Sequence, residues 1–224
     1  MPDTATIFLA GASRGVGWEV ASLLASQGKP VKAMLRSPDA RNALEKLGAT
    51  VVMGDALEIQ AVEAAMQPEP IPAVISTIGG LPKDGGTRAD FLGNKYLIDV
   101  AKQVGVKKFI LVSSIGTADS AKALNQQTLD VLGPVLAEKE QAEQYLATSG
   151  LTYTVIRPGG LKSEPPTGNG ILTEDSSVAG TITRADVAQL ICECLTSDKA
   201  NNRILAAVDK DTVRSSAPYT EFFL

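Results

Sequence analysis

Short apolar runs alternate along the chain with segments whose apolar residues recur at helical spacing. The first run, Ile7–Ala10, leads through a glycine-rich turn into a helical pattern that extends from Trp18 to Leu24. Further runs predict strands over residues 31–35, 49–53, 73–78, 107–114, 153–157 and 203–208, and helices over 38–47, 61–66, 87–104, 136–149 and 184–195. This alternation predicts an α/β fold with a doubly wound parallel sheet and helices on both faces.

The glycine-rich turn carries the clearest indication of chemistry. It comprises Gly11, Ala12, Ser13, Arg14, Gly15, Val16 and Gly17, and it lies between a predicted strand and a predicted helix. In a Rossmann dinucleotide site the first glycine makes the turn, the second admits the pyrophosphate and the third lets helix and strand pack closely. The free N–H groups of the helix start would face the phosphates. The alternative is a glycine-rich turn without a ligand.

Arg36 follows the second predicted strand, about twenty residues after the glycine turn, where an acidic residue would bind the ribose of NAD. An arginine cannot accept those hydrogen bonds, but it can donate to a 2′-phosphate, which favours NADP(H). Arg14, Ser13 and Ser37 could bind the same phosphate. The alternative for Arg36 is a solvated strand end.

Other candidate residues also follow predicted strands, where open parallel sheets bind their ligands. Asp55, with Ala56 beside it, could accept from the adenine amino group or cap a helix that starts near Leu57. Ser113 and Ser114 could lie near a substrate carbonyl or simply cap a strand end, and Ser113 is also a candidate for the cofactor site. The remaining candidates for the cofactor site are Thr77, Ile78, Gly79, Pro158, Gly159, Gly160 and Leu161.

The 224 residues fit a single domain, 1–224, with a small substrate-side region near the C-terminus. Residues 162–177 lack periodicity and predict a substrate-facing flap, so we expect 162–200 to form the flap and the helix behind it. Thr183 could cap that helix. The tail, 212–224, ends in Tyr219, Phe222, Phe223 and Leu224, which we expect to dock on their own domain rather than on a second subunit.

Composition excludes several classes of function. A net charge of −4 and a pI near 5.0 argue against nucleic acid as a main partner. The chain has no histidine, the commonest metal ligand and catalytic base, and we expect no metal site. Cys192 and Cys194 are two apart on a predicted helix, which suits neither a metal pair nor a disulfide. No basic leader opens the chain and no apolar run is long enough to span a membrane, so we expect a cytoplasmic protein.

Taken together, these residues resemble an atypical short-chain dehydrogenase/reductase. The resemblance rests on Gly11–Gly17, Arg36, Gly54-Asp55, Ser113–Gly116, Lys139 and Val155–Leu161, and it is closest to NmrA-like NAD(P)-binding proteins of plants and cyanobacteria. Flavin and biliverdin-IXβ reductases belong to the same wider set. Arg14 stands where the atypical branch more often has a glycine, and in this it resembles members that use NADP.

The resemblance implies that Lys139 holds the nicotinamide ribose hydroxyls. The catalytic tyrosine of the superfamily would lie four residues earlier, where this chain has Val135, which has no proton to give. The alternative for Lys139 is a surface lysine among Glu138, Glu140 and Glu143. We therefore take Lys139 and Ser114 as the candidate catalytic residues, with the proton coming from water or from the substrate.

Two functions follow. The first is an NADPH-dependent reductase of a conjugated small molecule, whose identity the sequence does not give. The second is a non-catalytic protein that senses the NADP(H) redox state and regulates a partner protein. An isomerase or lyase that uses its nicotinamide transiently is a third, weaker alternative. Either leading function is compatible with a monomer or a homodimer.

Overall fold

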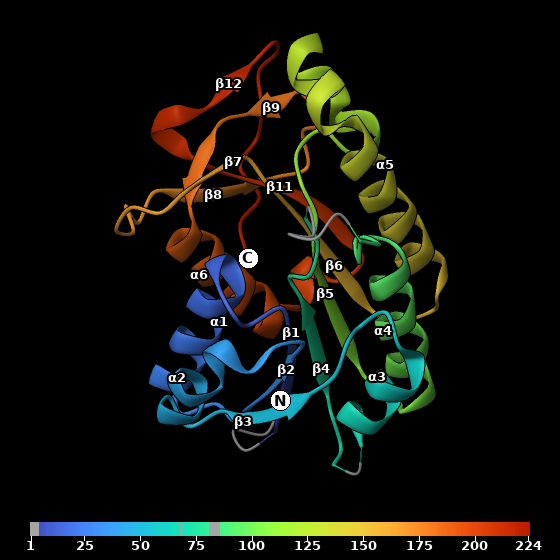
Figure 1. Ribbon diagram of the computed structural model, residues 1–224. Helices are drawn as coiled ribbons and strands as arrows, with labels where there is room; N and C mark the ends of the chain where they lie inside the picture. The colour runs from blue at the N-terminus through green and yellow to red at the C-terminus, as the bar shows by residue number, and fades with distance from the viewer. Residues whose placement is uncertain (1–4, 68, 81–85) are drawn as a thin grey trace.

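The computed structural model describes residues 5–67, 69–80 and 86–224, and its centre is an eight-stranded sheet (Figure 1). The strand order is β3-β2-β1-β4-β5-β6-β11-β8, and every neighbouring pair is parallel except β11 and β8. The bounds are β1 Ile7–Ala10, β2 Val31–Leu35, β3 Thr50–Met53, β4 Ala73–Ser76, β5 Lys108–Val112, β6 Tyr153–Pro158, β8 Gly170–Thr173 and β11 Arg203–Asp209. The predicted doubly wound sheet is confirmed.

Helices cover both faces of this sheet (Figure 1). On one face lie α1 Gly15–Ser26, α2 Arg41–Lys46 and α6 Arg184–Thr196; on the other lie α3 Ile59–Met66, α4 Leu92–Gln103 and α5 Gln126–Thr148. The two cores follow the alternation of the strands: Leu9 of β1 packs with the first group and Phe8 with the second. Burying both faces explains why the strands are nearly continuous apolar runs.

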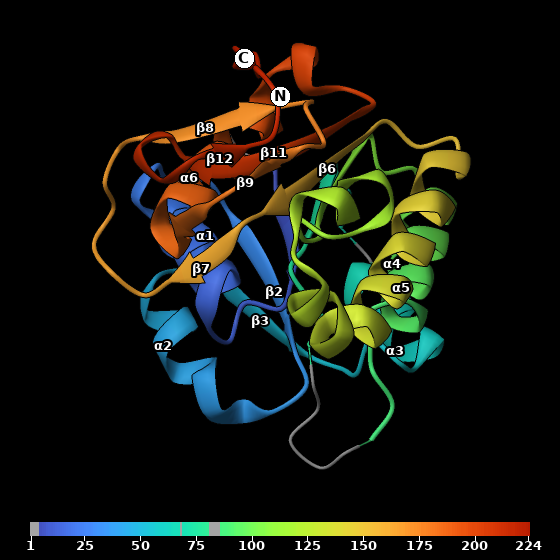
Figure 2. The ribbon, with the colours of Figure 1, turned by 90° about the horizontal axis from the view of Figure 1, so that it is seen from above.

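Because the strands from β3 to β11 run in one direction, their carboxyl ends share one edge of the sheet (Figure 2). The glycine turn, Arg36, Asp55, Thr77 and Ser113 follow β1, β2, β3, β4 and β5 at that edge. The topology therefore brings together residues that are as far apart in the sequence as Gly11 and Ser113.

Two helices begin five or more residues away from their predicted starts. α5 begins at Gln126 and not at Leu136, because Asn125 caps it by accepting a hydrogen bond of 2.9 Å from the N–H of Thr128. Its first turns are exposed and so lack the apolar periodicity on which the prediction depended; the side chain of Val131 is 75% exposed. α4 begins at Leu92 and not at Thr87. The predicted loop 81–86 lies outside the described residues except for Gly86.

The predicted flap contains regular structure, so the expectation of an irregular segment over 162–177 is wrong in part. β8 pairs antiparallel with β11 and forms the outer edge of the main sheet. Two short pairs lie beside it, β7 Gly160–Lys162 with β10 Thr181–Thr183 and β9 Val178–Ala179 with β12 Arg214–Ser215. The residues of the predicted flap that remain outside strands are 163–169 and the turn 174–177. Thr167 anchors the first of these stretches, because its N–H donates to Asp186 at 2.9 Å and its hydroxyl donates to Asp209 at 2.6 Å.

The C-terminal tail lies against its own domain. The N–H of Phe222 donates to the carbonyl of Leu172 in β8 at 2.7 Å, and the side chains of Phe222 and Leu224 pack against the core. Phe223 remains 73% exposed. Docking on the same domain is thus confirmed for Phe222 and Leu224. Among the described residues, no helix is long and apolar enough to cross a membrane.

Candidate functional site

The glycine turn is folded tightly against β1 and β4. Gly11 and Gly15 have positive φ angles of +95° and +61°, a region that side chains other than glycine rarely adopt. A Cβ placed on Gly17 would lie 2.2 Å from the carbonyl oxygen of Gly11 and 2.5 Å from the Oγ1 of Thr77. Thr77 in turn donates to the carbonyls of Ala10 and Gly11 at 3.2 and 3.1 Å. The start of α1 therefore packs closely against the ends of β1 and β4, and its backbone N–H groups are available to a ligand.

Arg14 and Arg36 lie at the carboxyl ends of the adjacent strands β1 and β2, and both are exposed. Within the described residues neither guanidinium takes part in an ion pair or side-chain hydrogen bond. Ser13 is also exposed, whereas Ser37 donates to Asp39 at 3.0 Å. Two uncompensated cations at neighbouring strand ends suit a phosphate.

Asp55 makes a local turn instead of capping a helix. Its Oδ1 accepts from the N–H of Leu57 at 2.9 Å, and α3 begins two residues later, at Ile59. The capping alternative is therefore wrong, while the adenine role stays a prediction. Ala56 and Ile78 converge on the start of α4: a Cβ on Gly93 would lie 3.3 Å from the Cβ of Ala56 and 3.0 Å from the Cδ1 of Ile78. The exits of β3 and β4 are thus packed together.

Lys139 points to the exit of β4. Its Nζ lies 3.1 Å from Oδ1 of Asp90, whose side chain is fully buried, and only 16% of the lysine side chain is exposed. Asp90 also accepts from the N–H of Gly80 at 2.9 Å. Gly79 has φ +142°, and a Cβ there would lie 2.3 Å from Asp90 and 3.0 Å from Lys139. The alternative of a surface lysine among glutamates is therefore wrong.

Sequence reasoning missed a buried network one turn along α5. Glu143 is 3% exposed and accepts hydrogen bonds from Ser113, from Thr117 at 2.8 Å and from Arg157 Nη2 at 2.7 Å. Arg157 also donates to Asp119 at 2.7 Å. Burial alone would lower the pKa of Arg157, but Glu143 and Asp119 raise it overall. An arginine directly after the apolar Val155-Ile156 was the signal, because a charge in a buried strand requires a partner.

Ser113 takes part in this network, and its role at the cofactor or substrate stays a prediction. Its hydroxyl donates to Glu143, so it fixes α5 against the end of β5. Ser114 is half-buried and donates to the carbonyl of Ile115 at 2.9 Å, a local bond that a ligand could replace.

Pro158, Gly159, Gly160 and Leu161 join the sheet to the substrate-side strands. The carbonyl of Pro158 accepts from Ile115 at 3.0 Å, and a Cβ on Gly159 would lie 2.4 Å from the carbonyl oxygen of Gly180. Leu161, on β7, is 40% exposed. There is therefore no room for a side chain where Gly159 passes Gly180. The apolar side chain of Leu161, by contrast, is exposed enough to contact a ligand.

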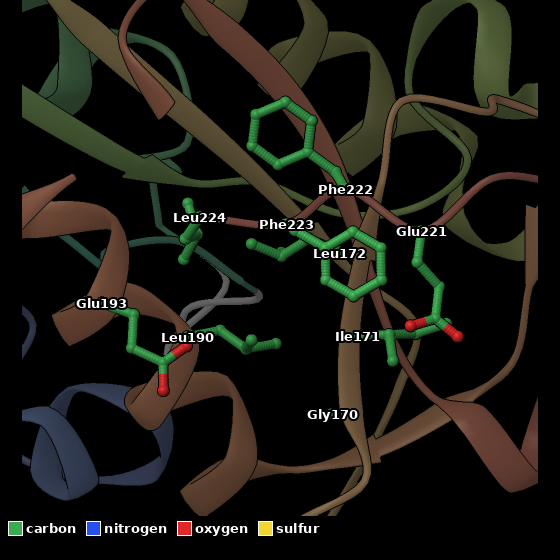
Figure 3. Close-up of a pocket in the computed structure, with 9 residues that line it drawn as sticks. All are labelled: Gly170, Ile171, Leu172, Leu190, Glu193, Glu221, Phe222, Phe223 and Leu224. Carbon is green, nitrogen blue, oxygen red and sulfur yellow. The ribbon is translucent and has the colours of Figure 1, made fainter. Parts of the chain in front are cut away.

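Two hollows lie away from this edge. One is formed by β8, α6 and the last residues of the chain (Figure 3), and the other lies near the amino ends of β1 and β4. Neither contains a residue predicted to bind the cofactor.

Neither cysteine has the setting of a reactive thiol. Cys192 and Cys194 are free and buried in the core, and burial raises the pKa of each thiol to about 12. The described residues contain no cluster of three or more acidic or cysteine side chains that could hold a metal ion.

Comparison with known proteins gives consistent matches. A family model described as NAD(P)H-binding matches residues 11–198. An uncharacterized chloroplastic protein of Arabidopsis thaliana is 34% identical over 231 residues, covering 96% of this chain and 79% of the relative. Sanguinarine reductase of Eschscholzia californica is 38% identical over 121 residues, covering 52% of this chain and 43% of that enzyme. The solved structure of ChuY from Escherichia coli O157:H7, described as an anaerobillin reductase, has a TM-score of 0.84 and 33% identity over 92% of this chain and 98% of its own.

Proposed function

The chain belongs to the NAD(P)H-binding family, and on this premise we propose that it is an NADPH-dependent oxidoreductase that reduces a conjugated small molecule. The family match agrees with the predicted cofactor class and with the resemblance drawn from the sequence. The observation that carries the proposal is Lys139, held by Asp90 beside Gly79 at the edge where the glycine turn also lies. Two of the compared proteins are named as reductases, which supports the same class of reaction.

The residues present fit a bound dinucleotide. The backbone of Gly11–Gly17 would hold the pyrophosphate, Arg14 and Arg36 the 2′-phosphate, and Asp55 the adenine. Lys139 would donate to the ribose hydroxyls on the nicotinamide side and add positive potential there. The bound cofactor would supply the hydride. The preference for NADPH over NADH rests on the two exposed arginines.

The acceptor is expected to be conjugated because the chain offers no proton donor at position 135. Val135 lies on α5 one turn before Lys139. An acceptor that delocalises the negative charge can take its proton from water, and positioning alone still accelerates hydride transfer. Ser114, at the end of β5, is the hydroxyl we assign to the acceptor.

The second candidate is a non-catalytic sensor of the NADP(H) redox state, which Val135 also favours. One series of measurements distinguishes the reductase from the sensor. Calorimetric titration with NADPH, NADP+, NADH and NAD+ comes first, and NADPH oxidation is then followed by absorbance with quinones, flavins and bilins. Turnover of one acceptor class supports the reductase. Tight binding without turnover, together with different partner proteins retained by the NADP+ and NADPH forms, supports the sensor.

Location and assembly belong to the same proposal. We propose a cytoplasmic monomer or homodimer; the Arabidopsis relative is named as chloroplastic, so fractionation and light scattering test these two points.

A further inference from the structure

Arg184 lies over the glycine turn, although it comes from the other end of the chain. Gly15 is the first residue of α1 and Arg184 the first residue of α6, and these two helices pack side by side (Figure 1). A Cβ placed on Gly15 would lie 3.6 Å from Nε of Arg184 and 3.8 Å from its Cδ. The half-buried arginine therefore borders the space above the N–H groups that begin α1.

The charge of Arg184 is not balanced by an acidic group. Its Nη1 donates to the hydroxyl of Ser163 at 2.7 Å, and in the described part of the chain it forms no ion pair. Asp186 is two residues away, but its oxygens accept from Thr167, Gly168 and Thr183. The first turn of α1 contains no acidic residue either. A guanidinium without an acidic partner, beside a helix N-terminus whose first turn lacks acidic residues, favours an anion.

We propose that Arg184 is a third arginine of the dinucleotide site, beside Arg14 and Arg36, and binds the pyrophosphate. The inference rests on the proposed function, because it requires the dinucleotide to lie on the glycine turn. Arg14 and Arg36 stand at the ends of β1 and β2, on the side of the 2′-phosphate. Arg184 instead borders Gly15, the glycine that in Rossmann sites allows the backbone to approach the pyrophosphate.

The hydrogen bond to Ser163 also links Arg184 to the substrate-side region. Ser163 follows β7 and opens the irregular stretch 163–169 of that region. A ligand that orders Arg184 therefore also orders the start of this segment. We therefore expect occupation of the phosphate site to affect the side of the fold where the acceptor is expected.

Ligand fragments distinguish this role from that of Arg36. In calorimetric titrations, Arg184→Gln should weaken NADP+ and NAD+ by the same factor, about tenfold or more, since a charge-assisted contact is lost. Adenosine 2′-phosphate, which lacks the pyrophosphate, should bind as it does to the wild-type protein. Arg36→Ala should instead weaken NADP+ and adenosine 2′-phosphate and spare NAD+. Arg203→Gln is the control, because it removes an equal charge at the amino end of β11, where Arg203 pairs with Glu174.

Unchanged NADP+ affinity in Arg184→Gln would overturn the inference, and so would an equal loss for adenosine 2′-phosphate. Should that variant fail to fold, Arg184→Lys keeps the charge but loses the forked donors, and it should still weaken NADP+. A wild-type protein that binds none of the dinucleotides overturns the proposed function itself, which separates the two failures.

Amide hydrogen exchange tests the link between Arg184 and the substrate-side region independently of affinity. ADP-ribose carries the pyrophosphate but no nicotinamide, so it cannot act through the acceptor side. At saturation it should slow exchange over residues 160–164 in the wild-type protein and leave that segment unchanged in Arg184→Gln. Equal protection in both proteins would show that Arg184 does not link the two regions.

Discussion

The ammonium of Lys139 lies 3.1 Å from the carboxylate of Asp90, and that carboxylate is fully buried. The pair joins α5 to the segment that precedes α4. The N–H of Gly80 donates a further hydrogen bond to the carboxylate of Asp90. Lys139 is therefore held in one place by a charge that has no other cationic partner among the described residues. The lysine that the resemblance assigned to the ribose is oriented by a residue that the resemblance did not include.

Breaking this pair should be costly. Removal of one partner leaves a buried charge unpaired, so Asp90→Asn and Lys139→Met should each lower the free energy of unfolding by about 3 kcal/mol. The double variant should lose less than the sum of the two. Urea unfolding measures all three, and the exposed pair Arg41 and Glu45 is the control, with an expected coupling of about 0.5 kcal/mol. Additive losses would mean that the two side chains do not interact in solution.

The phosphate assignment predicts a change of cofactor preference. Arg36→Ala, and more so the double variant with Arg14→Ala, should weaken NADPH by about 1.5–3 kcal/mol per lost contact and leave NADH nearly unchanged. Titration of both cofactors measures the difference. Arg41→Ala, which removes an exposed charge from α2, is the matched control. Retention of full NADPH affinity by the double variant would contradict the 2′-phosphate role.

The closeness of Gly17 to the strand predicts a steric effect. Gly17→Ala places a methyl group 2.2 Å from the carbonyl oxygen of Gly11, so the start of α1 must move and dinucleotide binding should be lost. Gly133→Ala is the opposite case: it lies within α5 with nothing within 4 Å of the new Cβ, and it should stabilise the protein by about 0.5–1 kcal/mol. Thermal unfolding and calorimetry check both variants. Normal NADPH binding by Gly17→Ala would show that the loop can relax.

The lowered pKa of Asp186 predicts that the folded protein loses stability in acid. Burial by itself would raise its pKa, but hydrogen bonds from Thr167, Thr183 and Gly168 lower it below the usual 3.8. The unfolded chain therefore binds this proton more tightly than the folded one. The stabilisation is complete above that value and is lost as the pH falls through the lower folded pKa.

Urea unfolding at several pH values tests this carboxylate. Asp186→Asn should cost about 2 kcal/mol at pH 7 and show a shallower decline below about pH 4 than the wild-type protein. Asp130→Asn, on the exposed start of α5, should change the free energy of unfolding by less than about 0.5 kcal/mol. Equal slopes for Asp186→Asn and the wild-type protein would contradict the assignment.

The sequence predicted the sheet well because buried parallel strands are continuous apolar runs bounded by glycine. The start of α5 was missed because that end is solvated, and only the cap at Asn125 marks it. β8 was missed because a four-residue edge strand leaves little periodicity.

For the site, the glycine turn could be recognised because its residues are consecutive. Asp90, Glu143 and Arg184 could not, since each acts on a partner between fourteen and 169 positions away in the chain. In the sequence, such charged residues cannot be distinguished from solvent-exposed ones, because only the folded structure shows their partners.

The placement of β8 affects how the protein is made. β8 precedes β11 in the chain but lies outside it in the sheet, with β11 as its neighbour. During synthesis residues 170–173 leave the ribosome before the strand on which they pair exists. Domains begin to fold from the N-terminus as they emerge. The apolar Ile171 and Leu172 must therefore wait unpaired while about thirty residues are added, and during this interval they are exposed to aggregation or chaperone capture.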